Sequence, residues 1–195
     1  SNEDLFFGIN ASVYETLKTN VSDKYEYVFP DMILNKNLFI DEKFGSLDFQ
    51  TNFKVHNYET NKLSNFLINE FNWESNDLIL NSKIKNKFLG KFRNINYETK
   101  NIDIYKDNPT AELFGAVGLL SEISLQKNKR DELHTLNPKM LIRYSPGSMR
   151  QEENGSRLTY LDTFKMDRLE NKNNFKTGAT ATFGFDFNIK KNEID

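Results

Sequence analysis

Long runs of alternating apolar and polar residues constrain this chain more than any other feature of its sequence. The segment FKTGATATFGFDFNIK, residues 175–190, shows the pattern best. Its odd positions read Phe, Thr, Ala, Ala, Phe, Phe, Phe, Ile, and its even positions are all polar or glycine. Successive side chains of a β-strand point to opposite faces, so the pattern predicts a strand with one largely apolar and one polar face.

The same alternation recurs along the chain and predicts an all-β fold. It is clear in segments 5–17, 44–58, 78–94, 111–126 and 136–146. Segments 23–37 and 62–75 carry apolar residues on both faces and are also predicted strands. Polar, turn-like connectors separate these segments. We therefore expect one domain over residues 1–195, an antiparallel up-and-down meander of about eight to ten strands.

One long irregular segment interrupts this rhythm between Pro146 and about residue 174. Within it, YLDTFKMDRLE has the apolar spacing of a short helix, with Leu161, Phe164 and Leu169 as its apolar residues. The sequence thus predicts a long loop with a short helical turn near residues 160–170.

Strand length favours one kind of β-protein over another. Several segments run beyond ten residues, whereas strands of globular proteins average about 5–6 residues and barrel strands that cross a membrane need about 9–11. The mean hydropathy of −0.67 is that of a polar chain. That value does not argue against membrane strands, because only alternate residues of such a strand face lipid. A soluble β-sandwich, whose strands also alternate, remains an alternative.

Composition argues against several functional classes. The net charge of −2 gives no general attraction to nucleic acid, and the absence of cysteine excludes disulfides, iron–sulfur clusters and thiolate zinc sites in this segment. Neither a nucleotide-binding fingerprint nor a hydrolase or metalloprotease motif occurs. The carboxylates are scattered without the spacing of an acid–base pair. The sequence therefore predicts no enzyme, no catalytic residue, no cofactor and no metal site.

A stripe of cations is the one candidate binding feature. It would lie on one face of the strand predicted over 78–94, and it has two interpretations. It is either a hydrated strand face, neutralised across the sheet by Glu112 and Glu122, or a cationic wall of a barrel lumen that faces phosphorylated or acidic cargo. The stripe consists of Lys83, Lys85, Lys87, Lys91 and Arg93.

Aromatic residues gather near the predicted strand ends. This placement suits the aromatic girdle of a membrane barrel, although the same residues would form core and rim in a soluble protein. They are Tyr25, Tyr27, Trp73, Tyr97, Tyr105, Tyr144 and Tyr160.

The stretch LNPKMLIRYSPG, followed by LTYLDTFKMDRLENKNNFKTGATATFGFDF, resembles the LptD family of lipopolysaccharide-assembly proteins, also called organic solvent tolerance proteins. The family pattern has a strand with an L-x-P start, a long loop, a short aromatic-containing segment that ends in Asp-Arg, and a strand entered through a glycine. The matching positions are Leu136, Pro138, Phe164, Asp167, Arg168 and Gly178. Upstream segments 25–37 and 44–73, with Pro30, also look like successive barrel strands of the family.

The resemblance implies a place and a function. The chain would be an open slice of a large transmembrane β-barrel in the outer membrane of Gram-negative bacteria, and the whole protein would insert lipopolysaccharide into the outer leaflet. Expected partners are lipopolysaccharide, an LptE-like lipoprotein plug, the periplasmic lipopolysaccharide-bridge proteins and outer-membrane lipid. Lipid would cover Phe183, Phe185, Phe187 and Ile189, and the lumen would receive Thr180, Thr182, Asp186 and Asn188.

The chain also departs from the family. LptD proteins are much longer, with a periplasmic jellyroll domain, cysteines and many more barrel strands, and outer-membrane barrels commonly end in an aromatic residue. Since this chain ends in NIKKNEID, we expect an internal slice of the barrel, with the lateral gate of the first and last strands outside it. Another outer-membrane channel and a soluble β-sandwich binding module remain the alternatives.

Overall fold

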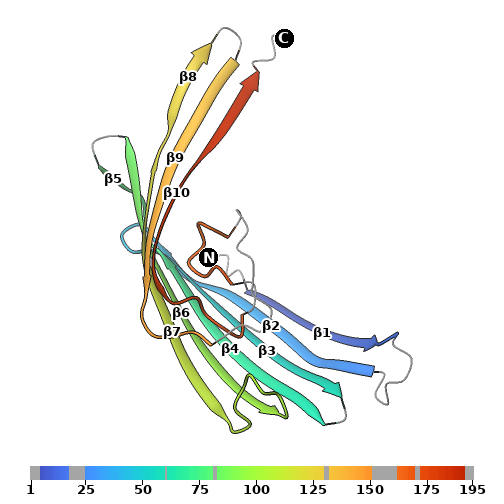
Figure 1. Ribbon diagram of the computed structural model, residues 1–195. Helices are drawn as coiled ribbons and strands as arrows, with labels where there is room; N and C mark the ends of the chain where they lie inside the picture. The colour runs from blue at the N-terminus through green and yellow to red at the C-terminus, as the bar shows by residue number, and fades with distance from the viewer. Residues whose placement is uncertain are drawn as a thin grey trace.

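The computed structural model describes residues 5–17, 25–59, 61–80, 83–129, 132–150, 162–169 and 172–191. These residues form one sheet of ten antiparallel strands and contain no helix (Figure 1). The strands are β1 (Leu5–Glu15), β2 (Tyr25–Asp41), β3 (Gly45–Glu59), β4 (Lys62–Glu74), β5 (Leu78–Leu80), β6 (Ile84–Lys100), β7 (Thr110–Ile123), β8 (Leu125–Lys129), β9 (Glu132–Ser145) and β10 (Gly178–Lys191). No helix within these ranges has the length and hydropathy needed to span a bilayer.

The long strands follow one another across the sheet in chain order. The order is β1-β2-β3-β4-β6-β7-β9-β10, with short β5 paired to β6 and short β8 paired to β9. The predicted all-β antiparallel meander is thereby confirmed. Within the described residues β1 pairs only with β2 and β10 only with β9, so the sheet is open at both ends.

Two predicted strands are each divided in the structure. Segment 78–94 contributes β5 and most of β6, which pair with each other as a hairpin across 81–83. Segment 111–126 contributes β7 and the start of β8, with a break at Ser124. Both errors have one cause: a polar residue within an alternating run can be either an outward strand position or a turn.

The helical turn expected near 160–170 is not found in the described part of that segment. Residues 162–169 form turns and bends, and one backbone–backbone hydrogen bond is found among them, in which the Lys165 amide donates to the Asp162 carbonyl at 3.0 Å. The backbone carbonyls of Met166 and Lys176 instead accept hydrogen bonds from Arg143 on β9. Bonds to the sheet thus take the place of bonds along a helix.

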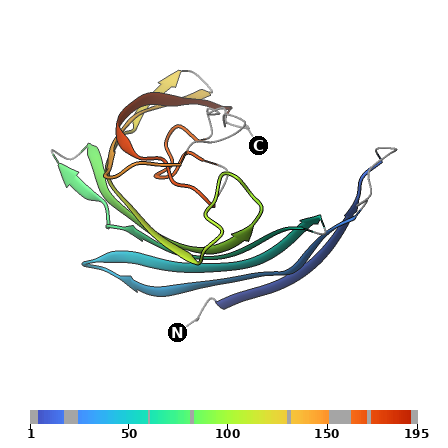
Figure 2. The same cartoon turned by 60° about the horizontal axis from the view of Figure 1, so that its bottom comes forward.

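The sheet is strongly curved, so its two faces meet different surroundings. Figure 2 shows the strands bending around residues 162–169 and 172–177, between β9 and β10, which lie on the concave side. We call these residues the inner loop. Cross-strand register places Arg93, Arg143 and Thr180 on the concave face and their sequence neighbours on the convex face.

The buried core lies between the concave face and the inner loop. It consists of Phe66, Ile68, Ile95, Tyr97, Phe114, Ala116 and Phe175, with Tyr105 and Met166 packed against it. Tyr97 and Tyr105 therefore belong to this core and not to a girdle on the convex face. Tyr25, Tyr27, Trp73 and Tyr144 do lie on the convex face, and Tyr160 is outside the described residues.

Candidate functional site

A buried ion cluster joins the inner loop to the middle of the sheet. Glu70 on β4 and Arg93 on β6 are direct cross-strand partners. The Arg93 Nε donates to Glu70 Oε2 at 2.7 Å, and its Nη1 donates to Asp167 Oδ2 of the inner loop at 2.6 Å. Lys91, two residues before Arg93 and on the same face, donates to Glu70 Oε1 at 2.6 Å. One arginine therefore holds a carboxylate of the sheet and a carboxylate of the loop.

Burial makes this cluster energetically important. The side chains of Arg93, Glu70 and Asp167 are 3%, 7% and 4% exposed. A charge removed from water in this way is tolerated only when it is paired and fully hydrogen-bonded, and loss of one partner leaves the other uncompensated. The Arg93 Nη1 also donates to the Asn174 carbonyl, so the same side chain fixes the inner loop at two points.

Two further arginines hold the inner loop through its backbone. Arg143 on β9 donates to the carbonyls of Met166 and Lys176. Arg150 donates to the Asn173 carbonyl and pairs with Glu112 on β7. Phe175 lies between two guanidinium groups, with the Arg93 Cζ 5.1 Å and the Arg143 Cζ 5.7 Å from its ring centre, within the range of cation–π attraction.

Two glycines allow the inner loop to lie directly on the sheet. A Cβ added at Gly118 on β7 would come within 2.8 Å of the Met166 sulfur. A Cβ added at Gly184 on β10 would come within 2.9 Å of the Phe164 ring. Real Cβ atoms do not approach other atoms this closely, so each glycine provides the space that one side chain of the loop occupies.

The substitution Gly184→Val should displace the inner loop. We expect a loss of about 1–3 kcal/mol in the free energy of unfolding, the usual cost of overpacking, and faster cleavage of the loop by protease. The control is Gly115→Ala on β7, where an added Cβ has no neighbour closer than 3.7 Å. Equal protease resistance of the two variants would contradict the packing described here.

The structure changes the interpretation of the predicted cationic stripe. Lys83 lies in the turn before β6, so it is not part of the strand. Lys85, Lys87, Lys91 and Arg93 do share the concave face, and each has an acidic partner. The partners are Asp77, Glu74, Glu70 and Asp167, which lie on β4, just after it or in the inner loop. Neutralisation within the fold therefore accounts for these four cations, through carboxylates other than the predicted Glu112 and Glu122.

The positions of the family-like motif fall in two places. Asp167 is buried in the ion cluster, and Arg168 donates to the Thr182 hydroxyl on β10. Gly178 begins β10 at a φ of +98°, a conformation that glycine adopts without strain. Pro138 lies on the convex face of β9, opposite Phe185. The structure thus brings Asp167 and Arg168 to the concave face and leaves Pro138 on the other side of the sheet.

The two faces predicted for β10 are found on the two sides of the sheet. Phe183, Phe185, Phe187 and Ile189 lie on the convex face, 46–74% exposed. Thr180, Thr182, Asp186 and Asn188 lie on the concave face, where Thr182 bonds to the inner loop and Asp186 pairs with Lys139. The expectation that lipid covers the exposed phenylalanines stays a prediction.

Sequence reasoning missed Glu70, Arg143 and Arg150, which act with Arg93 to anchor the inner loop. Glu70 lies in a segment with apolar residues on both faces, where alternation does not distinguish the inner side. Arg143 and Arg150 looked like ordinary polar positions. Their partners are a loop segment 23–33 residues later in the chain, and no local pattern reports such contacts.

The arrangement is suited to holding a segment against the sheet. Within the described ranges no group of three or more histidine, cysteine, aspartate or glutamate side chains could hold a metal ion. The charged groups of the cluster form hydrogen bonds with one another.

Comparison with models of known protein families finds no match to this sequence, and comparison with curated proteins finds none either. The resemblance to LptD therefore has no support from these comparisons and stays a prediction.

Proposed function

We propose that this chain forms part of the wall of an outer-membrane β-barrel, with its convex face toward lipid and its concave face toward the lumen. The observation that carries the proposal is the contrast between the faces. Exposed apolar side chains recur on the convex face of nearly every long strand, whereas the ion pairs that hold the inner loop lie on the concave face. Examples on the convex face are Phe7, Tyr27, Leu67, Phe88, Phe92, Leu113, Val117, Ile142, Phe183 and Phe185.

An exposed apolar surface of this extent requires a partner or a membrane. Soluble monomers rarely expose contiguous apolar patches above a few hundred Å². A β-sandwich would cover the convex face with a second sheet, but the described residues form one sheet only. A lipid bilayer would cover the convex face without a second sheet.

Strand lengths and connections agree with a membrane barrel. The eight long strands have 11–17 residues, and about 9–11 suffice to cross a bilayer. At one end of the sheet the connections 42–44, 81–83 and 130–131 are short. At the other end, 16–24, 101–109 and 146–177 are longer, while 60–61 is short. Outer-membrane barrels have short periplasmic turns and longer extracellular loops, so the second end would face outward.

The convex face also carries a row of polar side chains. Thr51, Asn69 and Asn94 lie on adjacent strands in register. The Thr51 hydroxyl donates to Asn69 Oδ1 at 2.8 Å, and the Asn94 amide donates to the Glu112 carbonyl at 3.3 Å. Polar groups next to lipid are costly unless they are hydrogen-bonded, and these bonds reduce that cost.

We further propose, on the resemblance to LptD, that the barrel transports lipopolysaccharide to the outer leaflet. The task needs no chemical reaction. Transport needs an apolar outer surface, a polar inner surface and a path through the lumen that the inner loop does not block. The inner loop covers part of the concave face and would have to be accommodated or moved as cargo passes. An LptE-like lipoprotein and the periplasmic bridge proteins would be the partners, and a different outer-membrane channel is the alternative.

Single cysteines on β10 test the proposed placement. The chain has no cysteine of its own, so each variant carries one label site. In outer membranes we expect a membrane-impermeant maleimide to label Asp186→Cys and Asn188→Cys and to spare Phe183→Cys and Phe185→Cys. In a soluble protein the phenylalanine positions would be the more reactive, because those side chains are 74% and 68% exposed. Labelling of the odd positions and not the even ones would rule out the proposal.

Crosslinking tests the cargo. A photoreactive residue at Asn188, on the concave face, should crosslink to lipopolysaccharide in cells, whereas the same residue at Phe187 should crosslink to phospholipid. Labelling as expected with no lipopolysaccharide adduct at Asn188 would retain the barrel and favour another channel.

A further inference from the structure

A hollow opens on the convex face where two glycines leave the sheet without side chains. Gly90 on β6 and Gly115 on β7 are diagonal neighbours in the ladder, since Gly90 pairs with Val117 and Phe92 pairs with Gly115. The hollow has a volume of about 570 Å³, within the range of pockets that bind small molecules. An added Cβ at Gly115 would meet nothing closer than the Lys91 carbonyl at 3.7 Å, so this part of the floor is open.

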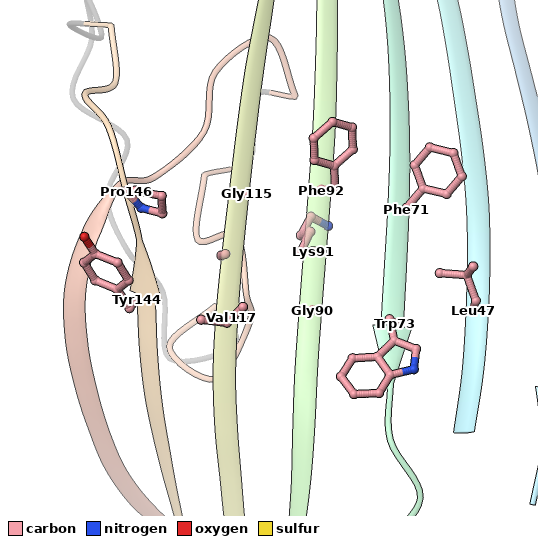
Figure 3. Close-up of a pocket in the computed structure, with 11 residues that line it drawn as sticks. Leu47, Phe71, Trp73, Gly90, Lys91, Phe92, Gly115, Val117, Tyr144 and Pro146 are labelled. Atoms are coloured by element: carbon pink, nitrogen blue, oxygen red, sulfur yellow. The ribbon is translucent and has the colours of Figure 1, made fainter. Parts of the chain in front are cut away.

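Large apolar side chains form the walls. Figure 3 shows Phe71, Trp73 and Leu47 on one side of the glycines and Tyr144 and Pro146 on the other. The Trp73 ring lies beside Gly90, where an added Cβ would come within 3.3 Å of the indole Cε3.

The hollow has little with which to bind a polar group. Lys91 contributes its backbone, because its ammonium group pairs with Glu70 on the opposite face. The Trp73 Nε1 already donates to the Phe44 carbonyl at 2.8 Å. The floor belongs to paired strands of the sheet, so its amides and carbonyls are committed to the ladder. The chemistry of the hollow therefore fits hydrocarbon.

Apart from the Tyr144 hydroxyl, the polar side-chain groups beside the hollow begin one row away. The next convex row beyond Phe71 and Phe92 is the row of Asn69 and Asn94, with Thr51 beside them. An apolar hollow bordered on one side by hydroxyl and amide groups matches an amphiphile whose chain ends in ester and headgroup oxygens. A protein partner would be expected to meet a polar rim around the whole site instead.

We infer that this hollow binds one acyl chain of an outer-leaflet membrane lipid, with the ester end of that chain on the row of Thr51, Asn69 and Asn94. The inference rests on the proposed membrane placement of the convex face and is continuous with that surface. The glycines allow the chain to lie against the backbone, where it contacts more protein atoms than a lipid on a flat strand surface would.

Trp73 gives a direct test, because it is the single tryptophan of the chain and lines the hollow. The full chain is inserted into vesicles of dioleoylphosphatidylcholine that contain a small fraction of the same lipid brominated at its double bonds. Bromine quenches indole fluorescence on contact. A chain held in the hollow stays in contact with the indole ring, so at any given bromolipid fraction Trp73 should be quenched more strongly than an indole on a flat part of the convex face.

Filling the hollow should abolish this effect. Gly115→Phe places a ring where the chain would lie, so Trp73 quenching should fall to the level of an indole on a flat part of the convex face. Gly115→Leu should reduce Trp73 quenching by a smaller amount. This variant replaces Gly115→Phe in the test if the larger side chain prevents insertion into the vesicles. Ile189→Phe is the matched control, since it enlarges an exposed convex residue of β10 outside the hollow and should leave quenching unchanged.

A second reporter separates this inference from the proposed function. In Trp73→Phe with Phe185→Trp, the indole lies on the convex face of β10, away from the hollow. If this indole and Trp73 are quenched to the same degree at each bromolipid fraction, the hollow binds no chain and the membrane placement stands. Equal quenching of Trp73 in the Gly115→Phe variant would also overturn the inference. If neither indole is quenched at any fraction, the proposed membrane placement fails.

Discussion

Replacement of Arg93 by methionine should lower the free energy of unfolding by about 3–5 kcal/mol, the usual cost of removing one partner from a buried ion pair. Methionine fills much of the same space but leaves the Asp167 carboxylate without its main partner. Lys91 still pairs with Glu70, so the uncompensated charge is the one on the inner loop. Urea unfolding in detergent micelles, followed by Trp73 fluorescence, measures the loss.

The same variant should release the inner loop. Trypsin has target residues within it at Lys165, Arg168 and Lys172, and we expect faster cleavage there than in the unmodified protein. Arg93→Met combined with Asp167→Asn should recover part of the stability, because no buried carboxylate then remains unpaired in the loop.

The control for Arg93 lies on the same face of the same strand. Lys87 pairs with Glu74 at 3.2 Å, but the two side chains are 33% and 54% exposed. Exposed pairs contribute about 0–1 kcal/mol, so Lys87→Met should have little effect on stability and none on cleavage of the loop. Losses of similar size in the two variants would show that the buried cluster is not what holds the loop.

Substitution of Phe185 by arginine should destabilise the protein in a bilayer by about 2–4 kcal/mol, the cost of a cation near the middle of the lipid-facing side of a barrel. Phe185 lies near the middle of β10 and is 68% exposed on the convex face. If water covered this face, the same change at an exposed position would alter stability by only about 0.5 kcal/mol. The measurement is reversible unfolding by denaturant from phospholipid vesicles.

Asn188→Arg provides the matched comparison, since Asn188 is three positions further on and points to the concave face. The Asn188→Arg substitution should leave the free energy of unfolding almost unchanged if the lumen is hydrated. Equal, small effects of the two substitutions would mean that the convex face of β10 does not meet lipid, and the proposed function would then fail.

The sequence by itself determined the fold class and the two faces of the strands. In β10, for example, each odd residue from Phe183 to Ile189 is apolar and each even residue is polar or glycine, and the period of a strand is two. The sequence also predicted the order of the strands, because polar connectors join strands that are neighbours in an antiparallel meander. Where a polar residue occurred inside an alternating run, as at Ser124, the pattern did not distinguish a strand from a turn.

Only the tertiary structure decided what the concave face holds. The partners of Arg93 are Glu70, which is adjacent through strand pairing, and Asp167, which is 74 residues away in sequence. Gly184 and Phe164 meet because the sheet curves around the inner loop. The hollow at Gly90 and Gly115 likewise depends on the register of two strands, which a one-residue shift would change entirely. Alternation indicates on which face of a strand a side chain lies, whereas the curvature of the sheet and the register of its strands decide which other residues that side chain contacts.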